Sequence, residues 1–66
     1  MLHLLLAMQK VERTPRAAVY GPEWLWHARA RGCDLSGHGA TPVEAMEDAL
    51  RIKHEIEHIR ARAATR

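Results

Sequence analysis

The sequence is poor in the features that stabilise or target many small proteins. It has one cysteine, Cys33, among 66 residues, so no disulfide can form within the chain. A lone free thiol suits a reducing compartment, and we expect a cytoplasmic protein. A domain of this length buries only about 60% of the surface that its unfolded chain exposes. Its stability is then expected to depend on a bound metal or on self-association.

Long apolar stretches are also absent. The most apolar segment, Leu2 to Met8, is far shorter than a membrane-spanning helix, which needs about 20 residues. No basic residue precedes Leu2, as a secretory signal would require. The net charge is +2 with neutral histidines, too small to indicate a nucleic-acid partner by itself. We expect one domain over residues 1–66 and no membrane association.

The first half of the chain is expected to form a small antiparallel sheet. Leu2 to about Glu12 is predicted as a buried strand, although its Leu, Ala and Met residues also suit a helix. Arg13 to Pro22 contains two prolines and Gly21 and is predicted as a connection, of which residues 17–20 could extend either neighbouring strand. The glycine-rich segment 32–40 can support a short third strand or a turn.

The second predicted strand shows a clear alternation from Trp24 to Arg31. One face carries Trp24, Trp26, Ala28 and Ala30, and the other carries Leu25, His27, Arg29 and Arg31. Period two over eight residues is typical of a half-buried strand. We expect both tryptophans to be buried, either between the sheet and a helix or in a subunit contact.

A helix is predicted from Pro42 to about Arg62. Thr41 and Glu44 have the spacing of a capping box, in which each side chain satisfies a backbone N–H at the helix start. Pro42 suits the first helical position because its missing N–H is not needed there. The predicted fold class is therefore α+β, with two to three antiparallel strands packed on one long C-terminal helix in the order β-β-β-α.

The second half of this helix carries a narrow apolar stripe made by Ile52, Ile56, Ile59 and Ala63. Spacings of four, three and four residues are typical of the seam that one helix offers to another. We predict that the stripe forms the interface of a homo-oligomer, a dimer or higher. The alternative is that the domain's own sheet covers it.

The segment HEIEH, from His54 to His58, matches the H-E-x-x-H zinc signature of metalloproteases. Helical spacing brings the two histidines together, roughly opposite the isoleucine stripe and so toward solvent. A catalytic zinc needs a third protein ligand, and no His, Cys, Asp or Glu follows His58. We expect no bound metal or cofactor, and a zinc hydrolase is the second, least favoured alternative function.

Two other groups of residues have the chemistry of possible sites. Cys33 and His38 are close in sequence, but a bystander thiol is the simpler interpretation of a single cysteine. His27, Arg29 and Arg31 form a basic row on the outward strand face, which suggests the first alternative function, a nucleic-acid-binding accessory protein. The tryptophans that base stacking would need point the other way, so a solvated face is favoured.

The order of these features resembles the HicB-like antitoxin family. The likeness covers roughly Trp24 to Leu50, and its matching residues are Trp26-His27-Ala28, Gly39-Ala40-Thr41-Pro42-Val43-Glu44-Ala45 and Ala49-Leu50. It implies a partial ribonuclease-H-like fold of three strands and a helix. The family's proline and glycine after the second strand are replaced here by Ala30-Arg31-Gly32-Cys33-Asp34.

The resemblance implies a non-catalytic protein-interaction module that self-associates and binds a small toxin ribonuclease. Full antitoxins of the family carry a C-terminal DNA-binding segment, and we expect no operator binding because residues up to Arg66 leave no room for one. Nuclease activity is not expected either. That chemistry needs an acid on the first strand, and residues 2–11 contain none.

Overall fold

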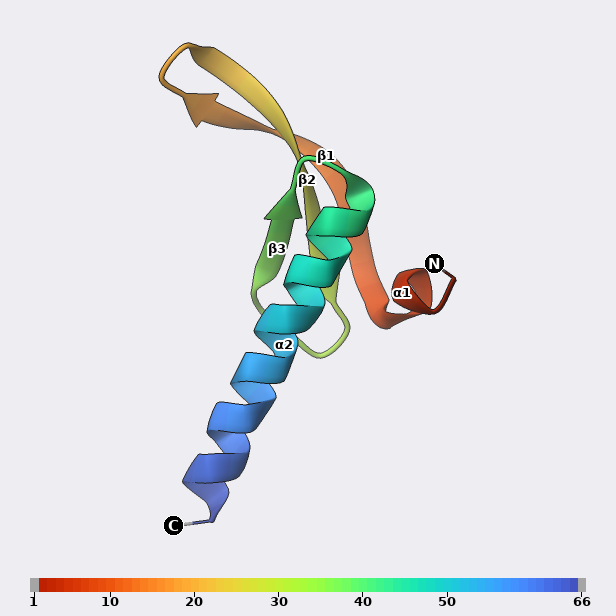
Figure 1. Ribbon diagram of the computed structural model, residues 1–66, viewed down its shortest axis with the longest axis vertical. Helices are drawn as coiled ribbons and strands as arrows, with labels where there is room; N and C mark the ends of the chain where they lie inside the picture. Colours follow the sequence, from red (N-terminus) through yellow and green to blue (C-terminus); the bar gives the residue numbers. More distant parts are fainter. Residues whose placement is uncertain (1, 66) are drawn as a thin grey trace.

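The computed structural model describes residues 2–65, and all side chains in that range except those of residues 17, 18 and 22. The elements, in chain order, are α1 (Leu2–Ala7), β1 (Met8–Ala18), β2 (Gly21–Ala30), β3 (Ser36–Gly39) and α2 (Pro42–Ala64). β2 lies between β1 and β3 in one antiparallel sheet, and α2 packs against it (Figure 1). The predicted α+β fold with the order β-β-β-α is confirmed.

The N-terminal apolar segment differs from its prediction as a strand. Leu2–Ala7 form the short helix α1, and the strand begins only at Met8. Leu and Ala lose little side-chain freedom in a helix, and no β-branched residue interrupts them. The carbonyl oxygens of Leu6 and Ala7 accept hydrogen bonds from Arg31 Nε at 3.0 Å and Arg31 N at 2.9 Å. Arg31 thereby satisfies carbonyls that the last helical turn leaves free.

The segment predicted as a connection, Arg13 to Pro22, is also different, because both strands continue through most of it. Only Val19 and Tyr20 form the turn between β1 and β2. Pro15 is tolerated inside β1 because this strand lies at the edge of the sheet. Gly21, directly after the turn, has a φ of 117°, which favours glycine. The result is a long hairpin that extends beyond the start of α2 (Figure 1).

An irregularity near the start of β1 sets which side chains face α2. Met8 pairs with Ala30, whereas Lys10 pairs with the adjacent residue on β2, Arg29, so Gln9 is an extra residue on the β1 side. Such a bulge changes the face on which the following side chains lie. Met8 is consequently buried, with 4% exposure, and Lys10 belongs to the opposite, outer face.

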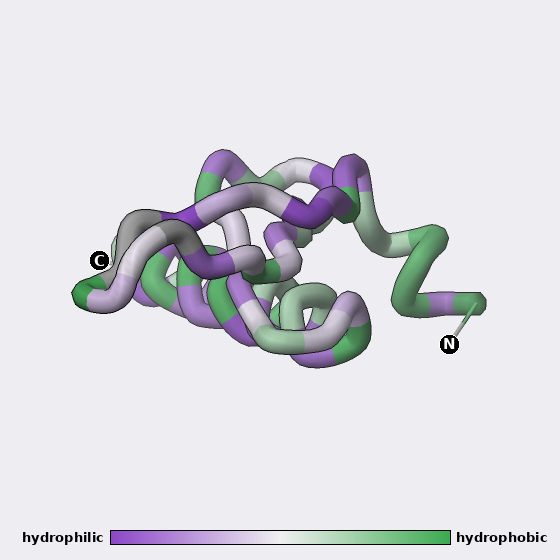
Figure 2. The backbone as a smooth tube through the Cα atoms, turned by 90° about the horizontal axis from the view of Figure 1, so that it is seen from above, coloured by the Kyte–Doolittle hydropathy of each residue, from purple (hydrophilic) through white to green (hydrophobic). Residues whose placement is uncertain are grey.

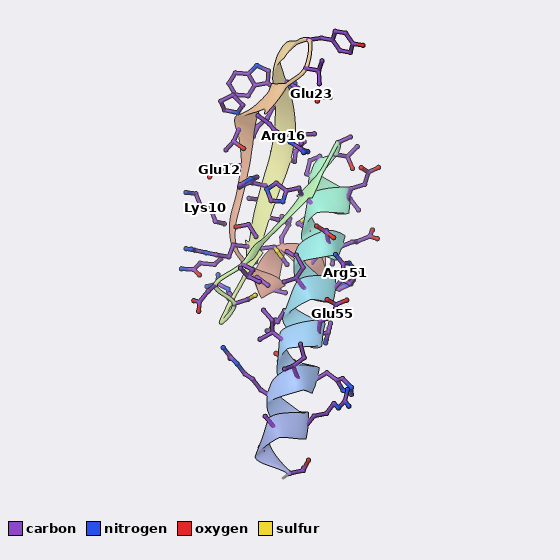
Figure 3. All side chains as sticks on the ribbon, turned by 90° about the vertical axis from the view of Figure 1, so that its left-hand side faces the viewer. Lys10, Glu12, Arg16, Glu23, Arg51 and Glu55 are labelled. Carbon is purple, nitrogen blue, oxygen red and sulfur yellow. The ribbon has the colours of Figure 1, made fainter. Side chains whose placement is uncertain are left out.

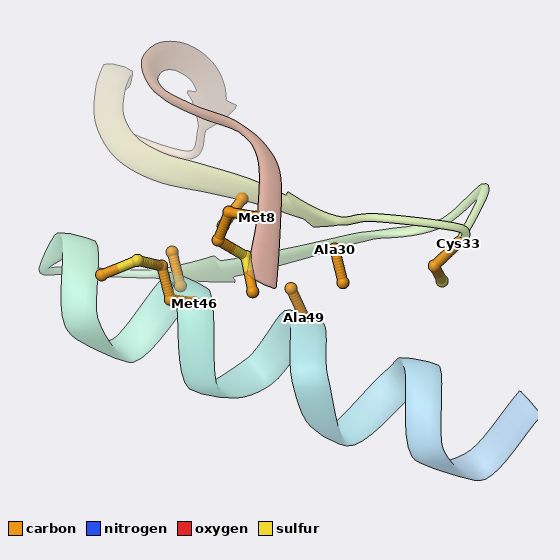
Figure 4. Packing of buried hydrophobic residues seen from close by; sticks show 7 residues of the cluster. Met8, Ala30, Cys33, Met46 and Ala49 are labelled. Carbon is orange, nitrogen blue, oxygen red and sulfur yellow. The ribbon is translucent and has the colours of Figure 1, made fainter. Parts of the chain in front are cut away.

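The core between the sheet and α2 is built mostly from small side chains. Its seven buried residues are Met8, Ala28, Ala30, Cys33, Ala45, Met46 and Ala49 (Figure 4). The predicted inward positions of Ala28 and Ala30 are confirmed, and Trp26 packs against this cluster. Trp24 remains 54% exposed because it lies farther along the hairpin, so within one chain it is not buried as expected.

Two glycines let α2 lie directly on β3. A Cβ added at Gly37 would collide with the backbone N of Ala49 and lie 2.7 Å from the carbonyl O of Ala45. One added at Gly39 would lie 2.7 Å from the N of Ala45. Both values are below any normal Cβ contact, so the backbones approach closely only because these residues lack a side chain. The glycine-rich segment, for which the sequence allows a short strand or a turn, thus contains a strand held against the helix.

The molecule is elongated, with extents of 47 × 30 × 14 Å. Its radius of gyration is 13.6 Å, against the about 11 Å expected for a compact chain of this length. From above, the N-terminal segment lies off to one side of the remaining elements (Figure 2). No helix within residues 2–65 has the length and hydropathy that crossing a bilayer requires.

Candidate functional site

The start of α2 shows the predicted cap with one difference. Thr41 Oγ1 accepts a hydrogen bond from the Glu44 N–H at 3.2 Å. Glu44 Oε2 accepts from the N–H of Ala40 at 3.0 Å, one residue before the cap residue to which the capping box would return. Glu44 therefore ties the helix to the end of β3 as well as completing the first turn.

One turn later, Asp48 makes a second link to β3. Its Oδ2 accepts from the His38 N–H at 3.0 Å, and its Oδ1 lies 2.8 Å from Arg51 Nη2. The backbone hydrogen bond from His38, together with the hydrogen bond from Arg51, lowers the pKa of Asp48. Arg51 also contacts Glu55 Oε1 at 3.0 Å, and the neighbouring carboxylates raise the pKa of the guanidinium (Figure 3). Asp48 and Arg51 are therefore held in place by their partners.

The sheet face opposite α2 is polar and carries charges of both signs. Its side chains form cross-strand rows, of which two are Lys10 with Arg29 and Ser36, and Glu12 with His27 and His38. Lys10 Nζ lies 3.2 Å from Glu12 Oε1, and the rings of His27 and His38 meet edge to face at 4.0 Å. Lys10, Glu12, Arg16 and Glu23 are labelled along the hairpin in Figure 3.

Two hollows on this face, of about 100 and 360 Å³, are bordered mainly by these polar side chains. Small-molecule pockets are instead lined mostly by apolar and aromatic groups. The outer face is therefore a polar surface of mixed charge that lacks the apolar lining of a typical small-molecule pocket.

The basic row predicted for nucleic-acid contact is not assembled as a row. His27 and Arg29 share the outer face, but Arg31 turns away to hold the C-terminal end of α1. The Arg29 Nε is buried and has no hydrogen-bond partner among the described residues. Trp24, which stacking on bases would require, contacts Arg13 at 5.7 Å from its ring centre. The arrangement offers two of the three predicted residues and no aromatic platform beside them.

The HEIEH histidines lie on the exposed part of α2. The side chain of His54 is 74% exposed, its Nδ1 lies 4.0 Å from Glu57 Oε2, and His58 is exposed as well. Within residues 2–65, no three His, Cys, Asp or Glu side chains gather as metal ligands. Among the residues that the structure describes, none is placed as a third ligand beside His54 and His58.

Cys33 belongs to the core rather than to a reactive site. Its thiol is buried, and Sγ lies 3.6 Å from the carbonyl oxygen of Leu35. Catalytic thiols are usually partly exposed and placed beside a base. Cys33 therefore fills the space under the β2–β3 turn.

The isoleucine stripe of α2 is divided between the core and solvent. Ile52 and Ile56 are partly buried and pack against the chain's own core. Ile59 is 64% exposed, and Ala63 is exposed with every residue from 57 to 65. The chain itself therefore covers the first half of the predicted interface and leaves the second half free.

Further apolar side chains are exposed at two places that sequence patterns did not identify. On α1, Leu2 is 71% and Leu6 is 66% exposed, with Leu5 beside them. At the hairpin end, Val19 and Tyr20 are almost fully exposed, near Trp24. At α1 the composition does contain the signal, because the Leu, Ala and Met residues that also suit a helix outnumber the β-branched residues that favour a strand.

Comparison with known proteins provides no relative for this chain, because no family model, no curated protein and no solved structure matches it.

Proposed function

We propose that the protein is a non-catalytic protein-interaction module that acts by self-associating. The observation that carries the proposal is the amount of surface left uncovered. The chain exposes 5087 Å², whereas a compact monomer of its 7.5 kDa mass exposes about 4,200 Å². The excess is about 900 Å². In a standard protein interface each partner buries a similar area, about 800 Å².

The exposed apolar side chains support the same proposal. Leu2, Leu6, Tyr20 and Trp24 are each more than half exposed, while the core contains few large side chains. Moving one such side chain from water into an interface contributes roughly 1.5–3 kcal/mol. A second subunit would therefore supply apolar burial that the small alanine-rich core lacks.

The groups most suited to chemistry already have structural roles, which favours binding over catalysis. Asp48 and Glu44 hold the edge of β3, Arg31 caps α1, and Cys33 lies in the core. A general base or nucleophile must be free to meet a substrate. An interaction module needs no such free group.

The resemblance to HicB-like antitoxins extends the proposal to a second partner, a small toxin ribonuclease. The β-β-β-α order is the one that this resemblance implies, and it supports the same class of function. The uncovered surface supports self-association, whereas the toxin partner is supported by the resemblance alone.

Light scattering coupled to gel filtration tests the proposal on untagged protein between about 10 and 200 µM. The expected mass is twice the 7.5 kDa of one chain or a higher multiple. Circular dichroism on the same samples shows whether the protein is folded. A folded monomer at the highest concentration would refute self-association.

The toxin is tested separately by purifying the untagged protein from its native host. A small basic protein that co-purifies at fixed stoichiometry, and whose ribonuclease activity falls on addition of this chain, is the expected result. A co-purifying nucleic acid released by salt would instead favour the alternative of a nucleic-acid-binding accessory protein.

A further inference from the structure

The two edges of the sheet are treated differently by the rest of the chain. At the β3 edge, the N–H of His38 donates to Asp48 and the N–H of Ala40 donates to Glu44, both at 3.0 Å. A strand that paired with β3 would have to displace both carboxylates from these donors. Natural proteins cover sheet edges in this way to prevent unwanted pairing. The β3 edge is therefore closed to a partner strand.

The β1 edge has no comparable cover. Within residues 2–65, no side chain forms a hydrogen bond to the backbone of residues 9–16. The bulge at Gln9 limits this edge on one side, and Pro15, which has no N–H to donate, limits it on the other. Between them, residues 10–14 form a regular stretch of edge strand with unpaired backbone groups.

Exposed leucines lie next to this open edge. Figure 1 shows α1 beside the start of β1, on the side of the sheet away from β3, and Figure 2 shows the N-terminal segment off to one side of the molecule. Leu4 and Ala7 pack against the core, and α1 contacts α2, so α1 lies toward the helix side of the sheet. Leu2, Leu5 and Leu6 remain exposed there. A subunit that added a strand to β1 would lie next to these leucines.

We propose that a second copy of the chain docks here, with its β1 antiparallel to β1 and the twofold axis at Val11. This inference rests on the self-association proposed above and names its surface. A twofold axis is the usual symmetry of homodimers, and it pairs each surface with itself. The two sheets would join into one of six strands, with both α2 helices on the same side.

Charge selects the register of this pairing. Lys10 and Glu12 lie on the outer face, where their side chains meet at 3.2 Å. An axis at Val11 puts Lys10 opposite the partner's Glu12, twice by symmetry. An axis at Glu12 would place two carboxylates opposite each other, and an axis at Arg13 would do the same with two guanidinium groups. Opposite charges in directly facing positions stabilise a strand pair and like charges destabilise it.

Two charge reversals test the register, with measurements at low ionic strength. In K10E alone, and in E12K alone, both cross-strand pairs of a homodimer become like-charged. Each variant is expected to dissociate with a dissociation constant raised about tenfold or more. When the two variants are mixed, the cross-strand pairs between them are of opposite charge. We expect the mixture to form heterodimers preferentially, as seen by native mass spectrometry.

This mixing result separates an intermolecular effect from an intramolecular one. Each reversal also breaks the Lys10–Glu12 pair within its own chain, and mixing cannot repair that loss. The matched control is K53E mixed with E57K, which reverses the Lys53–Glu57 pair of α2, separated by 3.8 Å. No heterodimer preference is expected for the control. No preference in the K10E and E12K mixture, or an equal preference in the control mixture, would overturn the proposed register.

Hydrogen exchange of the wild-type protein gives a second measurement that needs no variant. Amides of residues 9–14 should exchange more slowly as concentration rises, while those of β3 stay constant. A wild-type monomer at all concentrations would overturn self-association itself. A stable wild-type dimer without these effects, but dissociated by I59D, would overturn only the β1 interface and assign the contact to the α2 stripe.

Discussion

The two halves of α2 differ in how tertiary structure supports them, although they are one continuous helix. The first half, Pro42 to about Leu50, lies on β3 at backbone contact distance and includes three buried residues, Ala45, Met46 and Ala49. In the second half, Ile52 and Ile56 still pack against the core, but the helix then extends beyond the sheet and residues 57–65 are all exposed (Figure 1). That a residue of α2 is helical therefore does not show whether it packs against the sheet.

The difference shows two sources of helix stability. In the first half, glycine and alanine on both surfaces allow close contact, and the dispersion attraction of many atom pairs adds up. In the second half, good helix formers and ion pairs at four-residue spacing, such as Lys53 with Glu57, give a few tenths of a kcal/mol each. Substitutions that add or remove atoms in the first half should change the stability of the protein strongly. Substitutions of exposed side chains in the second half should change it only weakly.

The largest expected effect comes from filling the contact between β3 and α2. Gly37→Ala should lower the free energy of unfolding by about 3 kcal/mol, because the added Cβ overlaps the backbone of α2. Urea denaturation measures it. Ser36→Ala, one residue earlier on the opposite face, is the control and should stay within about 0.5 kcal/mol. Equal midpoints for the two variants would contradict the close approach.

Removing the helix cap should have an intermediate effect. Thr41→Ala deletes the acceptor of the Glu44 N–H and should cost about 1 kcal/mol of unfolding free energy. Thr65→Ala, at the opposite end, removes a hydrogen bond from Thr65 Oγ1 to the Arg62 carbonyl in an exposed position. That control should change stability much less. Similar losses at both ends would show that the ends are supported equally.

Acid should weaken the link between Asp48 and β3. The pKa of Asp48 is lowered in the folded state, so its contribution is complete above the ordinary aspartate pKa of about 3.9. It is lost as the pH falls through the lower folded value. Asp48→Asn should therefore make unfolding less dependent on pH in this acidic range. Denaturation of both proteins at several pH values would show a smaller slope for the variant, and equal slopes would contradict the link.

The smallest effect is expected in the exposed half. Replacing His54 and His58 together by Ala should change the unfolding free energy by no more than about 0.5 kcal/mol, because both side chains face solvent. Thermal melting with and without added zinc measures this. A large fall in the melting temperature, or zinc that binds the wild type stoichiometrically, would restore the hydrolase alternative.

Local chemistry was enough to predict several elements. Thr41, Pro42 and Glu44 specify a helix start through contacts within four residues, and the alternation from Trp24 specifies a half-buried strand. The candidate site was less predictable. Arg31 was grouped with His27 and Arg29 by strand alternation, but its partners are 24 and 25 residues away in α1. No local pattern contains such a pairing.

The sequence by itself determined the α+β class, with the strands before the long helix, and the capped start of α2, because propensity, alternation and capping act between near neighbours. Tertiary structure decided the rest. The bulge at Gln9 turns Met8 inward, and Gly37 and Gly39 are needed only because α2 lies against them. The same holds for the closed β3 edge, since the carboxylates of Glu44 and Asp48 reach it only after the helix has packed. Contacts between distant segments depend on how the backbones are finally arranged in space. The conformational preferences of short sequence segments do not specify that arrangement.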